Sequence, residues 1–227
     1  MKRGKKYNKA SKGLDKTVAY TLEEGIAKVK TLSYSKFPGT LEIHTSIKVP
    51  KDRDAKSIKG AVSLPNSTSQ KDVKIAVFCT PDKESIAKEA GADFVGLDNL
   101  IKDVKENKIS FDVAIATPSV MPKIAILGRE LGPKGLMPNP KNGTVTEDID
   151  VAVSEYKKGK QTFVCDPTGV IHMGVGSLEM EDSKLVENVH AAVAAICDVI
   201  GKNEDQAIKK VYICPTMGKA VKITYSR

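Results

Sequence analysis

The sequence predicts an α/β protein of two domains, with an α+β terminal domain made from both ends of the chain and an α/β domain inserted into it. Near both ends, apolar residues alternate with polar ones, whereas compact apolar strands alternate with helices in the middle. Polar or glycine-containing segments at residues 66–70 and 157–160 separate these regions. We therefore place the terminal domain at residues 1–67 and 158–227 and the inserted domain at residues 68–157.

The first part of the terminal domain is expected to contain one helix and two strands. Thr21 and Glu24 have the spacing of a capping box and precede an apolar helical repeat, which predicts a helix over residues 21–34. Alternation of apolar and polar residues predicts a strand over residues 41–49, and a second strand is expected at 59–64. One face of the first strand should therefore be exposed to water.

The inserted domain has the rhythm of a Rossmann-like fold. Its apolar strands alternate with amphipathic helices, which indicates a parallel sheet covered on both faces in a three-layer arrangement. The expected strands are residues 74–79, 94–95 and 111–116, and the expected helices are residues 81–90, 98–106, 118–129 and 147–156.

The last part of the chain returns to the terminal domain. Ser183 is expected to cap a long core helix that ends at Gly201, because apolar residues recur between them at steps of three and four. Two hairpins are expected around this helix, one from strands 161–165 and 170–173 and one from strands 210–214 and 220–224.

The net charge of +8 is unevenly distributed. Residues 1–67 contain 15 Lys/Arg and 6 Asp/Glu, residues 158–227 contain 9 and 8, and residues 68–157 contain 12 and 14. The terminal domain thus carries +10 (24 − 14) and the insert −2 (12 − 14). Such asymmetry favours a basic module that binds a polyanion, although the cationic run in residues 1–16 is also compatible with a solvated, disordered arm.

Several function classes lack their usual residues. The four cysteines are isolated and the three histidines lie far apart in sequence, so structural roles are favoured and no disulfide, metal site or cofactor is expected. A phosphate-binding loop and a nucleophile elbow are also missing, so no catalytic residue is assigned. The sequence has no long apolar segment and its N-terminus does not resemble a signal peptide, which predicts a cytoplasmic protein without membrane contact.

The most informative segment is LGRELGPKGLMPNPKNGTV, at residues 127–145. It has four glycines, three prolines and three cationic side chains, and is typical of an exposed recognition loop on a rigid scaffold. This run closely resembles the signature of the L-one family of large-subunit ribosomal proteins, in its bacterial form. Further similar motifs extend over almost the whole chain, at Gly4-Lys-Lys-Tyr7, Gly60-Ala-Val-Ser-Leu-Pro65, Ala90-Gly-Ala-Asp93, Ala116-Thr-Pro118 and Thr216-Met-Gly218.

The resemblance implies the two-domain L-one fold and a non-enzymatic, RNA-binding role on the ribosome. Members of this family bind the stalk of the large-subunit rRNA as a monomer within the ribosome. They assist release of deacylated tRNA from the exit site and repress translation of their own operon mRNA. This chain departs from the family pattern at Pro167 and Ser177, where lysines are frequent, so no phosphate contact is assigned to either position.

The candidate RNA-binding residues lie in the terminal domain. Cations suit phosphates, threonines suit 2′-hydroxyls, exposed apolar side chains suit sugars or bases, and glycine permits close approach of the backbone. The resemblance carries this role onto three motifs, which are Lys36-Phe-Pro-Gly-Thr40, Asp166-Pro-Thr-Gly169 with His172, and Thr216-Met-Gly218. The cationic run of residues 1–16 is interpreted as a phosphate-binding arm and adds three cations. The candidates are therefore Arg3, Lys5, Lys6, Lys36, Phe37, Thr40, Thr168, His172, Thr216, Met217 and Gly218.

Three alternatives remain open from the residues alone. Phe37 and Met217 could be core residues, with the Thr-Gly pairs forming ordinary turns. The chain could instead be a small-molecule or nucleotide-binding α/β enzyme whose basic ends tether RNA, or a free RNA chaperone that does not reside on the ribosome. The role of residues 127–145, in folding or in tRNA contact, is likewise not fixed by the sequence.

Overall fold

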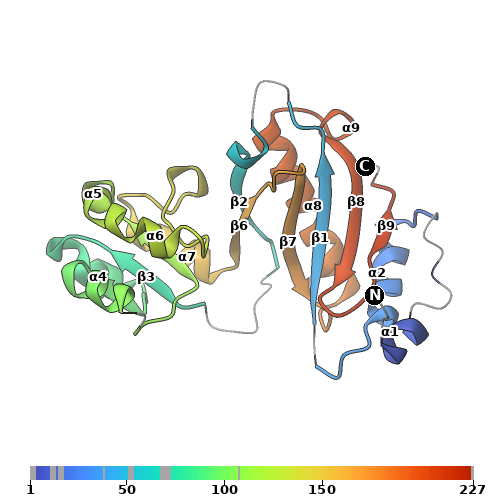
Figure 1. Cartoon of the computed structure of the whole chain (residues 1–227), viewed down its shortest axis with the longest axis horizontal. Coiled ribbons are helices and arrows are strands. Elements are labelled where there is room, and N and C mark those ends of the chain that lie inside the picture. Colours follow the sequence, from blue (N-terminus) through green and yellow to red (C-terminus); the bar gives the residue numbers. More distant parts are fainter. Residues whose placement is uncertain are drawn as a thin grey trace. The chain divides into compact units, whose positions relative to one another are not determined.

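The computed structural model describes residues 4–10, 14, 18–37, 39–50, 54–66, 73–106 and 108–225 (Figure 1). The chain divides into two compact units, one formed by residues 1–70 with 161–227 and the other by residues 71–160. The domain boundaries predicted from the sequence lie three residues from these divisions. The fold class is α/β with two domains, as the sequence predicts.

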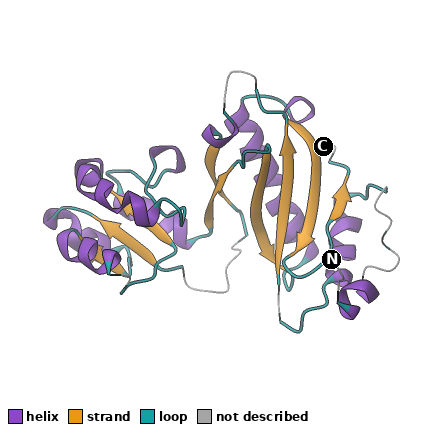
Figure 2. Cartoon of the chain, viewed as in Figure 1, coloured by secondary structure: helices purple, strands orange, loops and turns teal. Residues whose placement is uncertain are grey.

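The first unit contains an antiparallel sheet in the order β7-β1-β8-β9 and a separate two-stranded sheet, β2-β6 (Figure 2). Its strands are β1 (Thr40–Ile47), β2 (Lys59–Ser63), β6 (Lys160–Val164), β7 (Val170–Ser177), β8 (Ile208–Pro215) and β9 (Val221–Ile223). Its helices are α1 (Lys5–Ala10), α2 (Leu22–Leu32), α8 (Asp182–Ile200) and α9 (Glu204–Ala207), with a short 3-10 turn, η1 (Ala55–Ser57).

The core of this unit lies between one face of the four-stranded sheet and helices α2 and α8. Leu41, Ile43 and Ile47 on β1 are buried against residues from both helices, including Ile26 and Val193. The alternate positions of β1 remain partly accessible, in the strict alternation that the sequence predicts. The sheet therefore has one buried face and one polar face.

Helix termini in this unit follow the predicted chemistry at two of three positions. Thr21 and Glu24 form both hydrogen bonds of the capping box at the start of α2. Gly201 ends α8 in the left-handed conformation, at φ 73°. The N-cap of α8 is Glu181, however, and Ser183 lies inside the first turn, so the prediction of a Ser183 cap is wrong.

The predicted hairpin between residues 161–165 and 170–173 is also wrong. β6 pairs with β2, whereas β7 pairs with β1, and only an isolated bridge joins Cys165 to Ile171. The Asp166–Gly169 turn does reverse the chain. The strands then diverge because β7 extends the β1 ladder, which places Ile171 and Val175 in the main core.

The second unit contains a parallel sheet in the order β4-β3-β5 with helices on both faces. One buried cluster packs α4, α5 and α6 against Phe78 and Ala116, and the other packs α3 and α7 against Val77 and Ile115. This confirms the three-layer, Rossmann-like prediction. The elements are β3 (Ile75–Phe78), η2 (Pro81–Lys83), α3 (Glu84–Glu89), β4 (Phe94–Gly96), α4 (Asp98–Lys105), β5 (Val113–Ala116), η3 (Pro118–Val120), α5 (Met121–Ile124), η4 (Ala125–Leu127), α6 (Gly128–Leu131), η5 (Pro140–Asn142) and α7 (Ile149–Lys157).

The segment expected to form one helix over residues 118–129 is instead a series of short α and 3-10 turns from η3 to α6. Pro122 lies in the first turn of α5 and has no backbone N–H to donate to the carbonyl of Pro118. Pro122 therefore interrupts the helical ladder at this point. None of the described helices combines the length and apolarity needed to cross a membrane.

Candidate nucleic-acid interface

The predicted RNA-binding residues that the structure describes lie mainly along the polar face of the β7-β1-β8-β9 sheet and at the loops that border it. Glu42, His44 and Ser46 point away from the core, and their cross-strand partners share that face. On β8 and β7 these partners include Tyr212 and His172. We call this surface the open face.

One end of the open face joins two of the predicted motifs. The turn between β8 and β9 is held beside the start of β1, because the Thr216 backbone N–H donates to the Thr40 carbonyl at 3.0 Å. The Thr216 hydroxyl also donates to the Thr40 carbonyl at 3.1 Å and to Oε1 of Glu42 at 2.9 Å. Residues far apart in sequence, at the Lys36–Thr40 and Thr216–Gly218 motifs, are thus neighbours.

The two apolar residues of these motifs are exposed. Phe37 is 60% exposed and Met217 is 41% exposed. The alternative that they are core residues is therefore wrong. Exposure of large apolar side chains to water is unfavourable. The position of Phe37 and Met217 beside Thr40 and Thr216 therefore favours a surface that another molecule covers.

Gly218 has a structural reason to be glycine. A Cβ at this position would overlap the ring of Pro215 and would also approach the carbonyl oxygen of Leu32 at 3.4 Å. The absence of a side chain thus lets the β8–β9 turn fold tightly against the end of α2. The sequence analysis assigned this glycine to close approach of an RNA sugar, and that assignment stays a prediction.

A pair of histidines occupies the middle of the open face. The Nδ1 atoms of His44 and His172 are 2.7 Å apart, and the two residues are cross-strand partners. Nε2 of His44 lies 3.8 Å from Glu42, and Nε2 of His172 lies 3.5 Å from Asp166. Burial and the neighbouring His172 lower the pKa of His44, against a smaller opposite effect of Glu42.

The far end of the open face is built by the Asp166–Gly169 turn. The Asp166 carboxylate accepts hydrogen bonds from the backbone N–H of Val170 at 2.8 Å and from the backbone N–H and hydroxyl of Thr168 at 2.9 and 2.7 Å. These bonds, led by the one from Val170, lower the pKa of Asp166. The carboxylate is therefore charged at neutral pH, and it fixes the direction of the Thr168 hydroxyl.

The predicted phosphate-binding cations that the structure describes lie in two places. Lys36 immediately precedes Phe37, at the Thr216 end of the open face. Lys5 and Lys6 are on α1, whose Tyr7 packs edge-on against Tyr34 with ring centroids 6.3 Å apart, so this helix lies near the Lys36 segment. Arg3 lies outside the described residues.

Sequence reasoning missed several residues of the open face. Glu42, His44 and Asp166 connect the predicted threonines and His172 in a continuous polar row. Lys210 is the partner of Ser46, and Lys222 is the partner of Tyr212, so both lysines are also on this face. The alternation of β1 indicated Glu42 and His44, and Asp166 belongs to a predicted motif. Only the strand register reveals Lys210 and Lys222.

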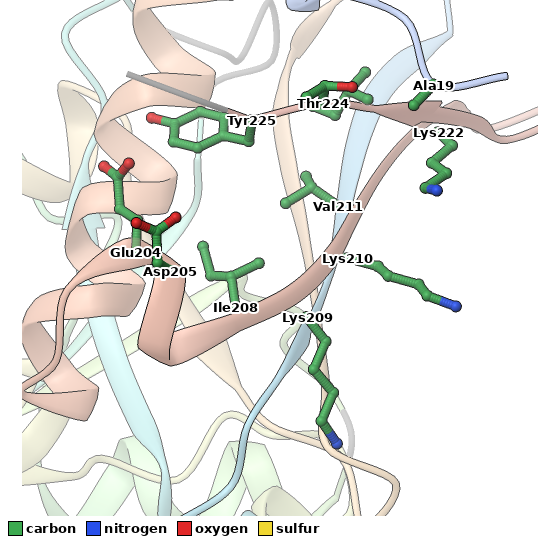
Figure 3. A pocket seen from close by; sticks show the side chains of 11 residues that line it. Ala19, Glu204, Asp205, Ile208, Lys209, Lys210, Val211, Lys222, Thr224 and Tyr225 are labelled. Carbon is green, nitrogen blue, oxygen red and sulfur yellow. The ribbon is translucent and has the colours of Figure 1, made fainter.

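A hollow of about 290 Å³ lies next to the open face, where β8 extends beyond the end of β9 (Figure 3). Figure 3 shows Lys209, Lys210 and Lys222 on the opposite side of the hollow from Glu204 and Asp205. It is shallow and polar, and it contains none of the predicted RNA-binding residues. Two of its lining residues, Lys210 and Lys222, also belong to the open face.

The four cysteines are free. Cys79, Cys165 and Cys197 are buried, and burial raises the pKa of each thiol. Burial and the nearby Glu42 raise the pKa of the half-buried Cys214 to about 11. Among the described residues, His, Cys, Asp and Glu side chains form no group of three that could hold a metal ion.

Comparison with known proteins identifies the family. The model of the ribosomal protein L1p/L10e family matches residues 29–219. The chain is 45% identical to the large ribosomal subunit protein uL1 of Leptospira biflexa serovar Patoc, over 98% of this chain and 96% of that protein. It is 40% identical to the protein of the same name from Kosmotoga olearia, over 100% and 98% of the two chains, and 41% identical to that from Phocaeicola vulgatus, over 94% and 92%. The chain therefore belongs to the ribosomal protein L1p/L10e family.

Proposed function

We propose that this protein is a structural constituent of the large ribosomal subunit and binds the stalk of the large-subunit rRNA through the open face. Its family consists of ribosomal proteins, and its relatives are named as large-subunit proteins, which supports a non-catalytic role on the cytoplasmic ribosome. The observation that carries the RNA-binding assignment is the exposure of Phe37 and Met217 beside the hydrogen-bonded Thr216 and Thr40. Aromatic and thioether side chains at such positions can pack on RNA bases and sugars.

The threonine hydroxyls on the open face are oriented to accept hydrogen bonds. Thr216 donates its proton toward Glu42 and the Thr40 carbonyl, and Thr168 donates its proton to Asp166. Each hydroxyl is left with lone pairs for an external partner. A ribose 2′-hydroxyl can donate a hydrogen bond to these lone pairs, whereas a phosphate oxygen only accepts. These positions therefore favour RNA over DNA.

Phosphates are bound by the cations at the border of this surface. Lys36, Lys5 and Lys6 lie at one end of it, and Lys210 and Lys222 lie along β8 and β9. Arg3 is assigned the same role from the cationic run of residues 1–16. If about five phosphates are neutralised, the logarithm of the affinity falls by roughly 3 to 5 per tenfold increase in salt.

Two further roles are proposed from family membership. The first is assistance in the release of deacylated tRNA from the exit site, and the second is repression of translation of the protein's own operon mRNA. An mRNA that folds like the rRNA site would bind the same open face. Competition between the two RNAs for the full chain tests this role, because a shared surface excludes simultaneous binding.

The main test is a binding titration of the full chain with a stalk rRNA fragment, the DNA of the same sequence and a scrambled RNA duplex, across a salt series. We expect the stalk fragment to bind at least about 3 kcal/mol more tightly than the duplex. Thr216→Val and Met217→Ala should each reduce this preference, whereas Thr162→Val, an exposed position on β6, should preserve it. Equal affinity for all three nucleic acids would contradict the assigned site.

Residence on the ribosome is tested separately. The protein should cosediment with large subunits in high salt, because a specific complex retains contacts that salt does not screen. A protein that leaves the subunits under these conditions would instead be the free RNA chaperone considered above.

A further inference from the structure

The His44–His172 pair is an unusual feature for a surface that meets RNA. Its two Nδ1 atoms are 2.7 Å apart, which is a hydrogen-bond distance. Such a contact needs one nitrogen that carries a proton and one that offers a lone pair. If both imidazoles are protonated, two N–H groups face each other, and the contact must open.

The surroundings of the pair contain charges of both signs. Glu42 on β1 and Asp166 in the turn before β7 lie beside the outer nitrogens. On β8, Tyr212 is the cross-strand partner of His44. The neighbouring positions of β8 on the same face are Lys210 and Cys214, which oppose Ser46 and Glu42 respectively, and Lys222 on β9 opposes Tyr212.

In the free protein these surroundings disfavour the charged form of His44 at neutral pH. Burial and the partner histidine lower the pKa of His44, so His44 is neutral there. The side chains remain reachable, because His44 is 25% and His172 is 53% exposed. An RNA backbone drawn to Lys210 and Lys222 would bring phosphate charge to the same face, which stabilises an imidazolium.

We propose that the His44–His172 pair couples RNA binding to proton uptake, so that RNA affinity increases as the pH falls from about 8 to about 5.5. This inference rests on the proposed function of the open face. One extra proton can reside on an outer Nε2 and leave the Nδ1–Nδ1 hydrogen bond in place. When both imidazoles are charged, the contact opens and an N–H donor becomes free for a phosphate oxygen. The pair would therefore make the protein's hold on RNA sensitive to pH within the range in which histidine titrates.

The sign follows from linkage. A group that binds its proton more tightly in the complex than in the free protein makes the complex more stable at low pH, and this advantage is lost as the pH rises above the group's pKa in the complex. Uptake of one proton gives at most about a tenfold change in Kd per pH unit. The change should be concentrated below about pH 7, because the ordinary pKa of histidine is about 6.5.

The test measures Kd of the full chain for the stalk rRNA fragment from pH 5.5 to 8 at constant ionic strength. The wild-type protein should bind at least about fivefold more tightly at pH 5.5 than at pH 8, and His44→Gln combined with His172→Gln should abolish most of this dependence. His190→Gln is the matched control, because His190 lies on α8 and contacts Tyr225 away from the pair. It should retain the wild-type pH dependence, which includes any titration of the RNA itself.

The outcomes separate this inference from the proposed function. If the wild-type protein prefers the stalk fragment at pH 8 but binds it equally at all pH values, the coupling is wrong and the function stands. The same holds if the double variant keeps the wild-type pH dependence. If the stalk fragment is not preferred at any pH, both are wrong. NMR titration of the imidazole resonances provides a second measurement on the unmodified chain, in which the pKa of His44 should rise when RNA binds.

Discussion

The two sheets of this protein differ in how many of their faces are covered. In the inserted unit, helices pack on both sides of the parallel sheet, and all four residues of β3 are buried. In the terminal unit, helices cover one side of the antiparallel sheet, and alternate residues of β1 remain accessible. Parallel sheets are buried because their crossover helices must lie on the faces, whereas an antiparallel sheet can leave one face to solvent.

This difference determines where functional side chains can lie. A sheet covered on both faces leaves only its edges and loops accessible to a partner. One such loop follows α6 at residues 132–145, and we call it the basic loop. A sheet with an open face presents a row of side chains spaced at regular intervals, which in β1 extends over about 20 Å. The terminal unit therefore presents the longer row of accessible side chains and carries the excess of cations, which is why we propose that RNA binds there.

The largest difference between the two units is expected when an exposed apolar side chain is removed from each of them. Phe37→Ala should weaken binding to the stalk rRNA by about 1–3 kcal/mol, because a base or sugar loses its packing surface. Ile126→Ala is the matched control, since Ile126 is 64% exposed in the inserted unit. It should leave the affinity unchanged. Filter binding or fluorescence anisotropy at one salt concentration measures both variants.

Thermal unfolding of the same variants checks the interpretation. Phe37 is 60% exposed, so its truncation removes little buried area and should change stability little. A large loss of stability in Phe37→Ala would mean that the residue supports the fold. A loss of affinity in Ile126→Ala would place RNA contact in the inserted unit as well.

Most elements of both sheets could be predicted from the sequence, because their signals are local. The alternation of β1 and the capping box at Thr21 each depend on residues that are close together in the sequence. The same holds for the βα rhythm of the insert, although the helix expected over residues 118–129, which contains Pro122, is a series of short turns.

The candidate site was less predictable because it depends on pairing between distant segments. His44 and His172 are separated by 128 residues, and only the β1–β7 register brings their rings together. Glu42 and Thr216 are likewise distant in sequence, and the pairing of β1 with β8 brings their side chains into hydrogen-bond contact. The wrong β6–β7 hairpin shows the opposite error, in which adjacency in sequence suggested a pairing that tertiary contacts override.

A second comparison uses one glycine from each unit. Gly218→Ala should destabilise the terminal unit by about 1–3 kcal/mol, because its Cβ would overlap the Pro215 ring and the turn must shift. Gly128→Ala should be neutral or stabilising by about 0.4–1 kcal/mol, since Gly128 is helical and a Cβ there meets no atom within 4 Å. Denaturant unfolding of both variants, followed by RNA binding, measures the two effects.

The outcome also distinguishes two roles of Gly218. A structural role predicts that affinity and stability fall together and that lower temperature restores part of the affinity. If Gly218→Ala is as stable as the wild type but binds RNA poorly, the residue acts through close approach of RNA to the backbone. Full stability with full affinity would exclude both roles.

The smallest expected effect concerns the basic loop of the inserted unit. The buried Tyr156 on α7 donates its hydroxyl proton to the Asn142 carbonyl at 2.8 Å, and burial raises the pKa of this phenol. The Asn139 backbone N–H donates to the Thr144 hydroxyl at 2.7 Å, and this hydroxyl donates to the Asn139 carbonyl at 3.0 Å, which closes the same loop.

Tyr156→Phe should therefore lower the free energy of unfolding by about 0.5–1.5 kcal/mol and speed amide hydrogen exchange in residues 139–144. Exchange in β1 and affinity for the stalk rRNA should stay at wild-type values. A loss of RNA affinity without a change in β1 would show that the loop, and not only the open face, takes part in binding.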